Sequence, residues 1–429
     1  MKLFPNRRRF LKVSAAAAGL ALNRGAAVAH PQIGSNELPE PPGDVGNFIK
    51  SKIAEHRLPG AGIAFVDNAR VVWEAGFGLS NIETGDEVTP RSLFQAASLT
   101  KPLFAYVVHQ TIDRGELSLE DRLVDYVRPT DLSPHPWIDQ ITVRDALQHT
   151  SGLPNWRNHT DWIEPLTPAY EPGTDSSYSG EAYHWLQMVM ERVTGKGLDA
   201  FMRDRLFEPA GLVDMQMHWS ADRDWREVYS HELDQSGNIV VRDLQYIREI
   251  GWRFAEIADR WGKPLTQWTT WDHAQAIAEM RPHTHPRLKD IPSWNWATAG
   301  RSIIDSASSL RCTPGDYARF VCLLMPGGRE AAWKIKEPTR ELMLSPQFER
   351  PDVQNGMLPR GLGWGLEKRP NGIAFYHWGK NGRSHHAIAL GDASTRKGIV
   401  VMTHGTNGKA LIRDVVTELM SESYVGVVT

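Results

Sequence analysis

The chain has 429 residues, of which 41% are hydrophobic and 23% charged, and its formal net charge is −3 at pH 7. This length is enough for one large domain built in two parts with a site between them. Acidic and basic residues are interspersed, so no basic face indicates nucleic acid and no acidic run indicates a store of cations. These features favour a small molecule as the partner.

The first 29 residues resemble an export signal rather than part of a fold. Residues 7–12 read Arg-Arg-Arg-Phe-Leu-Lys, the pattern of a twin-arginine signal. The weakly apolar stretch over 13–22 is too short to span a bilayer, and the small residues at 27–29 suit a signal peptidase. We therefore predict a mature start near His30, a periplasmic protein and no stable membrane anchor after cleavage. A basic disordered tail is the competing interpretation.

Hydrophobic periodicity and turn residues predict strands near both ends of the chain and helices in the middle. Strands are expected over 61–66, 71–76, 363–368, 373–378, 387–391 and 398–403, and helices over 45–56, 104–113, 143–149, 180–193, 316–325 and 411–423. This order predicts an α+β fold, in which an antiparallel sheet made from N- and C-terminal segments is flanked by helices and carries a mainly helical inserted subdomain. We assign a single domain over 40–429, with 45–95 and 350–429 in the α/β part and 96–349 in the helical part.

The stretch from Ser98 to Lys101 has the clearest chemical meaning. Pro102 has no N–H and is tolerated in the first turn of a helix, so a helix is expected to begin near Ser98. Residues i and i+3 share a helix face, which brings the Lys101 amine towards the Ser98 hydroxyl. A helix N-terminus and burial both favour a neutral lysine, which is able to take the proton of the serine. The alternative is that Ser98 caps the helix beside a solvated lysine.

Two further regions carry weaker signals. Residues 313–316 read as a helix start, which would carry Cys322 along the following helix, so Cys312 and Cys322 are expected to be two thiols rather than a disulfide. Residues 219–309 are polar and rich in tryptophan, and we expect helices and large loops there rather than a separate core.

No motif in the sequence indicates a metal ion or an organic cofactor, and we predict neither. The pairs His283-x-His285 and His385-His386 lack carboxylate-rich companions at ligand spacing. The Gly-x-Ser-x-Gly, His-Glu-x-x-His and phosphate-binding Gly-x-x-x-x-Gly-Lys patterns do not occur. A conventional α/β-hydrolase or zinc protease is therefore not expected.

The Ser98 stretch is followed by companion motifs in a fixed order. These motifs are Leu147-Gln148-His149-Thr150-Ser151-Gly152, Glu171-Pro172-Gly173-Thr174, Tyr178-Ser179-Gly180 and His377-Trp378-Gly379. Together they make the chain, from about Pro59 to its end, similar to the serine β-lactamase-like superfamily, in particular its class C β-lactamase, esterase and D-peptidase branch. Residues from Trp219 to about Trp296 match no signature of that branch.

The resemblance implies roles for four side chains. Ser98 corresponds to the nucleophile, Lys101 to its partner base, and Tyr178 to the tyrosine that passes a proton to the leaving group. His377 would lie near the acyl or leaving group. A Lys–Tyr pair is able both to remove the serine proton and to deliver a proton to the departing group, and the choice between Lys101 and Tyr178 as base stays open.

The resemblance also implies the groups that hold the substrate. The backbone N–H groups of Ser98 and Lys380 would form the oxyanion hole, and Trp378, Gly379 and Gly180 would contact the substrate. Three departures bear on specificity, because Gly180 stands in place of Asn, His377 in place of a permanently charged lysine, and Trp378 in place of threonine, adding bulk beside the cleft.

All three departures disfavour an efficient β-lactamase and leave acyl transfer to water intact. The predicted function is therefore a secreted serine hydrolase that cleaves a small ester or amide through an acyl-serine, and that is esterase-like more than β-lactamase. The alternatives are a D-aminopeptidase or weak β-lactamase, and a noncatalytic protein that binds cell-wall peptide on the same scaffold.

Overall fold

The computed structural model describes residues 38–156, 165–242, 245–280, 304–327, 331–348, 359–421 and 423–428. The chain divides into two compact units, Met1–Leu38 and Pro39–Thr429, and the fold described below is that of the second unit. The predicted signal peptide and the pair His283-x-His285 lie outside the described residues. Within the described part of the chain, no helix has both the length and the hydropathy that a membrane crossing requires.

A seven-stranded antiparallel sheet in the order β3-β2-β1-β11-β10-β9-β8 forms the framework. Its strands are β1 (Gly60–Asp67), β2 (Arg70–Asn81), β3 (Asp86–Glu87), β8 (Gly365–Arg369), β9 (Gly372–Asn381), β10 (His385–Asp392) and β11 (Lys397–His404). Strand β1 pairs with β11, so that Ala61 lies opposite Thr403 and Val66 lies opposite Gly398. The two ends of the chain therefore meet inside one sheet, which confirms the predicted fold class.

Strand β2 is longer than the sequence pattern predicted, because it continues past Gly76 to Asn81. Gly76 and Gly78 interrupt the apolar alternation that signals a strand, yet both still pair with β1. A side chain at Gly76 would meet the Val88 carbonyl oxygen at 2.3 Å. The glycine is thus required by a close approach of backbone and does not mark the end of the strand.

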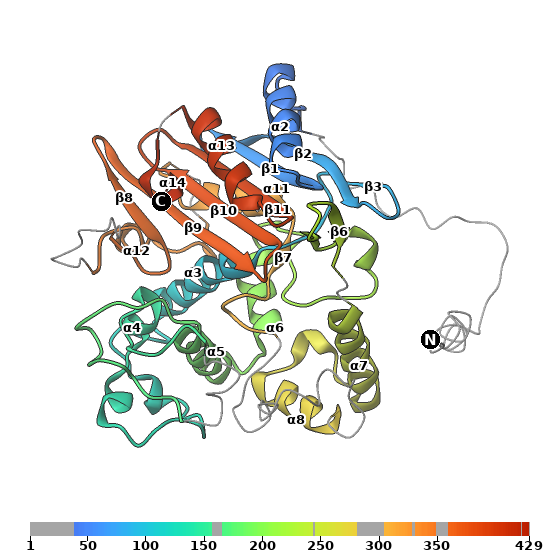
Figure 1. Cartoon of the computed structure of the whole chain (residues 1–429). Helices are drawn as coiled ribbons and strands as arrows, with labels where there is room; N and C mark the ends of the chain where they lie inside the picture. Colours follow the sequence, from blue (N-terminus) through green and yellow to red (C-terminus); the bar gives the residue numbers. More distant parts are fainter. Residues whose placement is uncertain are drawn as a thin grey trace, which may run out of the picture. The chain divides into compact units, whose positions relative to one another are not determined.

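Helices α2 (Gly43–Glu55), α13 (Gly408–Met420) and α14 (Val425–Val428) cover one face of the sheet, which we call the outer face (Figure 1). The side chains between these helices and the sheet are apolar, with Ile49 and Ile53 from α2 and Leu411 and Val415 from α13. Their spacing of three to four residues gives each helix a single apolar stripe to bury.

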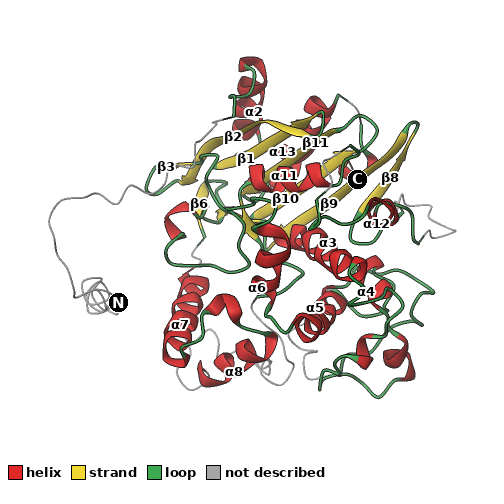
Figure 2. Ribbon diagram, turned by 180° about the vertical axis from the view of Figure 1, so that it is seen from behind, coloured by secondary structure: helices red, strands yellow, loops and turns green. Residues whose placement is uncertain are grey.

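Helix α11 (Pro314–Leu323) crosses the opposite, inner face of the sheet, as the view from behind shows (Figure 2). Although α11 falls within residues 96–349, which we assigned to the helical part, it packs against β1, β10 and β11. Helix α3 (Thr100–Asp113) also belongs to the core of this side, and its residues 100–111 are all buried. The apolar run over 102–108 explains this burial, because a helix segment that is apolar on all sides is expected to lie inside a core.

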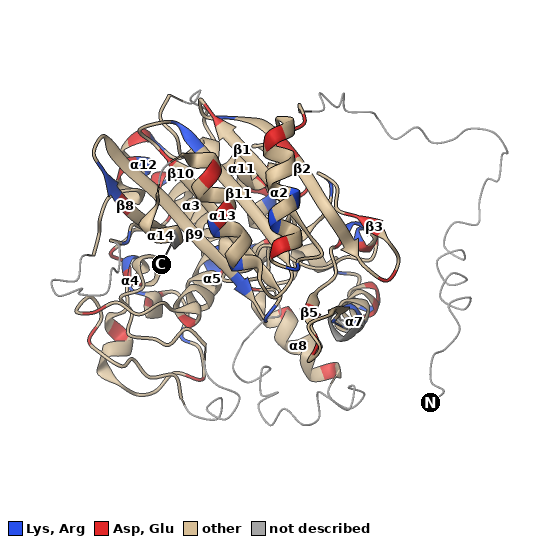
Figure 3. Ribbon diagram, turned by 45° about the horizontal axis from the view of Figure 1, so that its top comes forward, with Lys and Arg blue, Asp and Glu red and all other residues tan. Residues whose placement is uncertain are grey.

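The remaining elements form the helical part and its connections. They are β4 (Phe94–Gln95), η1 (Ala97–Leu99), η2 (Leu123–Asp125), η3 (Pro136–Gln140), α4 (Val143–Gln148), α5 (Gly180–Thr194), α6 (Leu198–Met202), η4 (Arg203–Phe207), η5 (Asp224–Arg226), β5 (His231–Leu233), β6 (Ile239–Val241), α7 (Gln245–Trp261), η6 (Leu265–Gln267), α8 (Thr270–Met280), β7 (Arg311–Cys312) and α12 (Glu337–Met343). Acidic and basic side chains are interspersed over these elements and over the sheet, as the composition predicted (Figure 3).

Helices α7 and α8 enclose a small core of their own, which corrects the expectation that residues 219–309 lack one. Ile250, Phe254 and Ile257 of α7 belong to it, together with Trp268 and Ile277. These positions of α7 are spaced i, i+4 and i+7 and are separated by charged residues, so the apolar stripe is narrow. The surrounding polar residues concealed that stripe in the sequence.

Cys312 on β7 and Cys322 on α11 are both free thiols, as predicted. Burial raises the pKa of the Cys312 thiol well above its usual range and that of Cys322 to about 12. Both sulfurs are therefore protonated and poor nucleophiles near neutral pH.

Candidate active site

Ser98 lies in the single turn η1 that leads directly into α3. The preceding residue, Ala97, has a φ of 51°, a conformation that residues with a Cβ rarely adopt. The chain therefore turns sharply immediately before Ser98. Ser98 is partly exposed, whereas Lys101 is only 1% exposed. Ser98 therefore lies at the edge of the core, and the Lys101 side chain lies inside it.

The Lys101 amine lies 3.5 Å from Ser98 Oγ and donates a hydrogen bond to the Ala307 carbonyl oxygen at 3.0 Å. Its nitrogen lies 4.5 Å from the centre of the Tyr178 ring and 5.5 Å from that of Tyr183. None of the ion pairs formed by described residues includes Lys101. The spacing of three residues brings the two groups together as predicted, and the carbonyl holds the amine in place.

Tyr178 joins Ser98 and Lys101 from the segment before α5. Its ring lies 4.3 Å from the ring of His149 and 6.0 Å from that of His377, measured between centroids. Its hydroxyl is buried and has no hydrogen-bond partner among the described residues. An unmade hydrogen bond at a buried hydroxyl costs about 1–3 kcal/mol.

His149 was not among the predicted site residues, although it belongs to the motif Leu147–Gly152. It ends α4 in the left-handed conformation, and its Nδ1 accepts a hydrogen bond from the Ser179 N–H at 3.0 Å. Burial, then the charges of Arg360 and Lys101, lower its pKa well below the usual value. The imidazole is therefore neutral, carries its proton on Nε2 and packs against the rings of Tyr178 and Tyr183.

His377 lies on β9 and is 7% exposed. Its Nδ1–H donates to the Trp378 carbonyl oxygen at 2.8 Å, which leaves Nε2 as an acceptor. Burial and, next, the Lys101 charge lower its pKa to about 3. His377 is thus a neutral group beside Tyr178. It does not supply the permanent positive charge that a lysine at the same position would supply.

Trp378 lies on the outer face, so the expectation that its ring adds bulk beside the cleft is wrong. Its indole packs with the apolar residues under α13 and α14, and its N–H donates to the Gly426 carbonyl oxygen at 2.8 Å. Successive strand residues point to opposite faces of a sheet. His377 and Gly379 face Ser98, and the residue between them must therefore face away.

Gly379 and Lys380 lie where β9 passes the Ser98 turn. A Cβ on Gly379 would lie 2.3 Å from the Ala96 carbonyl oxygen, so no larger residue fits between β9 and this turn. Strand β8 pairs with β9 only as far as Tyr376, and residues 377–380 continue beyond it. The Lys380 side chain is exposed. Its N–H as an oxyanion donor remains a prediction, consistent with this approach.

Gly180 is a packing position, which corrects its prediction as a substrate contact. It is the first residue of α5, and its N–H donates to the Asn155 carbonyl oxygen at 2.9 Å. A Cβ there would lie 2.6 Å from that oxygen and from the Trp156 ring. Trp156 thus occupies the space into which a side chain at residue 180 would extend.

Arg360 is a second cation of the site that the sequence did not reveal. Its guanidinium carbon lies 5.8 Å from the centre of the Tyr178 ring. Its charge acts together with that of Lys101 to lower the pKa values of His149 and His377. Arg360 is far from Ser98 and Tyr178 in the sequence and belongs to no motif, so only the folded chain brings it here.

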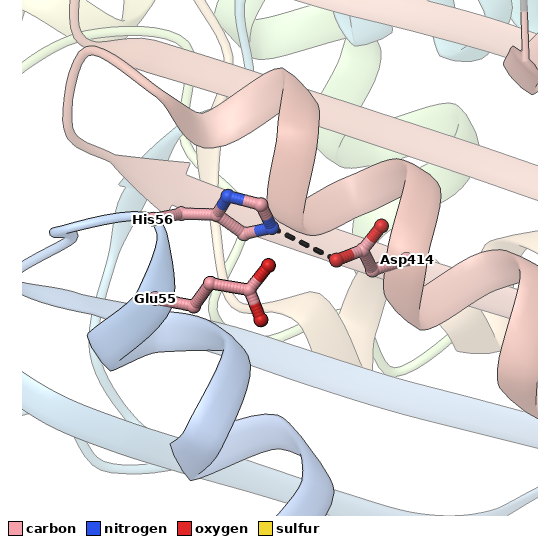
Figure 4. Close-up of side chains that lie close together, drawn as sticks. All are labelled: Glu55, His56 and Asp414. Atoms are coloured by element: carbon pink, nitrogen blue, oxygen red, sulfur yellow. Dashed lines mark hydrogen bonds and ion pairs between the residues drawn. The ribbon is translucent and has the colours of Figure 1, made fainter.

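Glu55, His56 and Asp414 form the one group of three potential metal ligands among the described residues (Figure 4). Asp414 accepts hydrogen bonds from His56 Nε2 at 2.8 Å and from Lys52 Nζ at 3.1 Å. Lys52 also pairs with Glu55 at 2.8 Å, and these carboxylates raise its pKa. An ammonium already satisfies this cluster, which we interpret as an ion-pair tie between α2 and α13.

The fold and the site together define a class: serine hydrolases whose nucleophile is served by a lysine three residues later. Within that class the chain belongs to the Beta-lactamase family, whose model matches residues 45–417. Its solved neighbours have the same fold at low identity. A class C β-lactamase has a TM-score of 0.62, 16% identity and coverage of 89% of this chain and 96% of the other. The D-alanine carboxypeptidase AmpC from Burkholderia cenocepacia has a TM-score of 0.61, 18% identity and coverage of 88% and 99%.

Relatives similar in sequence match over shorter stretches. Penicillin-binding protein 4 of Amycolatopsis lactamdurans is 32% identical over 171 residues, which cover 37% of this chain and 44% of that protein. The N-acetylmuramyl-L-alanine amidase of Bacillus subtilis (strain 168) is 29% identical over 199 residues, with coverage of 39% and 44%. The chain thus matches less than half the length of these curated relatives.

Proposed function

We propose that this protein is a secreted serine hydrolase that cleaves a small ester or amide through an acyl-serine intermediate. The observation that carries the proposal is the approach of Lys101 Nζ to within 3.5 Å of Oγ of the partly exposed Ser98. The buried, unpartnered Tyr178 hydroxyl beside this pair supports it, because a proton-transfer group needs a free position for the reacting partner.

The reaction would run in two halves. The Ser98 oxygen attacks the acyl carbon while its proton passes to Lys101 or Tyr178, and the same pair returns the proton to the departing alcohol or amine. The N–H groups of Ser98 and Lys380 would hold the oxyanion that forms on the carbonyl oxygen. A water molecule then attacks the acyl-serine, gives up a proton to the pair, and the acid leaves as Ser98 recovers its hydrogen.

An ester is the substrate type that we favour over a β-lactam. His377 is a neutral imidazole, and Trp156 fills the space at Gly180 where the family often has an asparagine amide. Both features remove a contact that a penicillin-like substrate would use. Trp378 does not affect a substrate contact in this way, because it lies on the outer face.

Arg360 gives specific support to a second candidate, a D-peptidase. Its permanent charge near Tyr178 suits a substrate with a free carboxylate, such as the C-terminus of a short peptide. Penicillin-binding protein 4 and the D-alanine carboxypeptidase AmpC, both similar to this chain, agree with this candidate.

Intact-mass spectrometry after brief exposure to a fluorophosphonate and, separately, to an activated p-nitrophenyl ester tests the proposal. We expect an adduct on Ser98 that is absent from the Ser98→Ala variant, which should fold normally. Absence of any adduct on folded wild-type protein would overturn the proposal in favour of a noncatalytic peptide-binding protein. Comparison of turnover of a p-nitrophenyl ester, a D-alanine amide, a D-alanyl-D-alanine peptide and nitrocefin then separates the esterase from the D-aminopeptidase, the D-peptidase with a carboxylate substrate and the weak β-lactamase.

Export to the periplasm is a separate part of the proposal and rests on residues 7–12. Replacing Arg7 and Arg8 by lysine should retain the protein in the cytoplasm of an expressing bacterium, because a twin-arginine signal requires that pair. Cell fractionation would measure this, and unchanged export of the double variant would contradict the assignment.

A further inference from the structure

The carbonyl oxygen that accepts a hydrogen bond from Lys101 belongs to Ala307. Ala307 lies in a buried segment, residues 305–307, which follows α8 and precedes β7 in the sequence. Ala307 is fully buried, and its N–H donates to Asp305 Oδ1 at 2.7 Å while its oxygen accepts from Lys101 at 3.0 Å. The backbone of Ala307, held through its N–H by Asp305, thus sets where the Lys101 amine lies. Whatever fixes this segment also fixes the proposed base.

Helix α5 fixes the segment through Ser306. The Ser306 N–H donates to Gln187 Oε1 at 2.8 Å, and the Ser306 hydroxyl donates to the Tyr183 carbonyl oxygen at 2.8 Å. Ser306 is fully buried and Gln187 is 1% exposed, so water does not compete for these bonds. A buried hydrogen bond of this kind is directional and strong.

Glu191, one turn further along α5, is one of the acceptors that hold the Gln187 amide in a single orientation. Gln187 Nε2 donates to Glu191 Oε1 and to Thr270 Oγ1, both at 3.1 Å. The Ser306 N–H only donates, so the Gln187 amide oxygen faces Ser306 and the amide nitrogen faces Glu191, Thr270 and the Ile304 carbonyl oxygen. The Thr270 N–H, at the start of α8, donates to Glu191 Oε2 at 2.9 Å.

Burying the carboxyl group of Glu191 costs free energy, and this cost bears on why a glutamate occupies the position. Glu191 is buried, and none of the ion pairs among the described residues includes it. Burial raises its pKa to about 7, against the opposing effect of the hydrogen bonds from Thr270 and Gln187. An apolar side chain would fill the same space without a desolvation penalty. A glutamate at this position is therefore explained by its hydrogen bonds with Gln187 and Thr270.

We propose that Gln187 and Glu191 are positioning residues of the active site: Glu191 orients the Gln187 amide, which holds the 305–307 segment so that the Ala307 carbonyl keeps Lys101 beside Ser98. The inference rests on the proposed function, since it gives meaning to the position of Lys101. It also assigns a task to α8, whose first residue, Thr270, supplies two of the contacts to Glu191.

A charge swap between the two residues tests the proposal. In Glu191→Gln the new amide has two possible orientations. In one, its NH2 group faces the NH2 group of Gln187, and neither is able to accept. In the other, its oxygen faces Gln187, and the hydrogen bond from the Thr270 N–H is lost. In Gln187→Glu two carboxyl groups face each other. We expect each single variant to acylate with the fluorophosphonate about 10-fold or more slowly, with kcat for a p-nitrophenyl ester reduced and KM little changed. The double variant Gln187→Glu/Glu191→Gln restores one donor facing one acceptor and should recover most of the rate.

The pH profile of acylation separates positioning from simple loss of stability. Because the contacts that fix the Lys101 amine change, the pH profile of the acylation rate should differ from that of the wild type in the single variants and return to it in the double variant. Arg192→Gln, on the exposed side of α5, is the matched control and should leave rate and profile unchanged. Where a single variant does not fold, Thr270→Val removes only the hydroxyl partner and should still slow acylation several-fold.

Single variants, or Thr270→Val in their place, that are folded and react at the wild-type rate with the wild-type pH profile would overturn the proposal. A double variant no better than the singles would also overturn it. Failure of the wild-type protein to react at all would instead refute the proposed function, and this result is distinguishable because it does not depend on the variants.

Discussion

The two faces of the central sheet differ in what they bury. The outer face, under α2, α13 and α14, buries apolar side chains and the satisfied indole of Trp378. The inner face near β9 instead buries Lys101, two neutral histidines and a tyrosine hydroxyl that has no hydrogen-bond partner in the described part of the chain, next to the strained backbone of Ala97. Backbone strain and buried polar groups often cluster at functional sites, so the contrast agrees with an outer face that stabilises the fold and with the active site proposed on the inner face.

The largest effect is expected from a methyl group added on the inner face. In Gly379→Ala the new Cβ would meet the Ala96 carbonyl oxygen at 2.3 Å and push β9 away from the Ser98 turn. A displacement of about 1 Å at a reacting centre costs about 100-fold in rate, and we expect kcat/KM to fall by about that factor. Gly46→Ala on α2, where no atom lies within 4 Å of the new Cβ, is the control. Equal activity of both variants would remove the distinction between the faces.

Trp378→Ala is the test of the outer face, where a substitution should affect stability rather than activity. The variant leaves a cavity under α14 and an unpaired Gly426 carbonyl, so the free energy of unfolding should fall by about 2–3 kcal/mol. Because the ring does not face Ser98, kcat/KM of the folded variant should stay near the wild-type value. Chemical denaturation and ester hydrolysis measure the two quantities. A selective loss of activity at unchanged stability would show that Trp378 belongs to the site.

The neutral histidines of the inner face predict a loss of stability in acid. The pKa of His377 is about 3 in the folded protein, below its value of about 6.5 when unfolded, so the unfolded chain binds the extra proton between these values. Stability should therefore fall as the pH decreases below about 6.5, and His377 alone should contribute about 1–2 kcal/mol between pH 8 and pH 5. Unfolding of the wild type and of His377→Gln over this range tests the expectation, and identical pH slopes would contradict it.

The smallest effect is expected at the ion-pair cluster of the outer face. Asp414→Asn removes the acceptor shared by Lys52 and His56, and partly exposed pairs contribute little, so only a small fall in Tm should follow. Added zinc should leave the Tm of both proteins unchanged, because Lys52 already occupies the cluster. A rise in the wild type alone would identify a metal site instead.

Local patterns predicted much of the fold and the centre of the site. Strand alternation and helix periodicity located β1, β9, β11 and α3, because side-chain burial has a fixed period in each element. The Ser98–Lys101 pair was predictable from an i, i+3 spacing, and the structure brings it together with Tyr178 and His377. The small core of α7 and α8 was missed because tryptophans and charged residues dilute its apolar stripe.

Sequence adjacency within a motif was the least reliable predictor of which residues contact the substrate site. Trp378 was assigned to the site because it follows His377, and the pleat of β9 turns it to the other face. Gly180 was assigned because it follows Tyr178, and the Trp156 ring turns it into a packing position. A motif lists residues in chain order, whereas a site is made by the side chains that share a face.

By itself the sequence determined the class of fold, the family of serine hydrolases and the Ser98–Lys101 pair, since these depend on short-range spacing and on motif order. Only the tertiary structure decided which cations and hydrogen bonds surround that pair. Arg360 reaches Tyr178, and Glu191 acts on Lys101 through Gln187 and Ser306, across separations of more than one hundred residues. Such contacts depend on how the sheet and the helices pack, and no local pattern of residues encodes them.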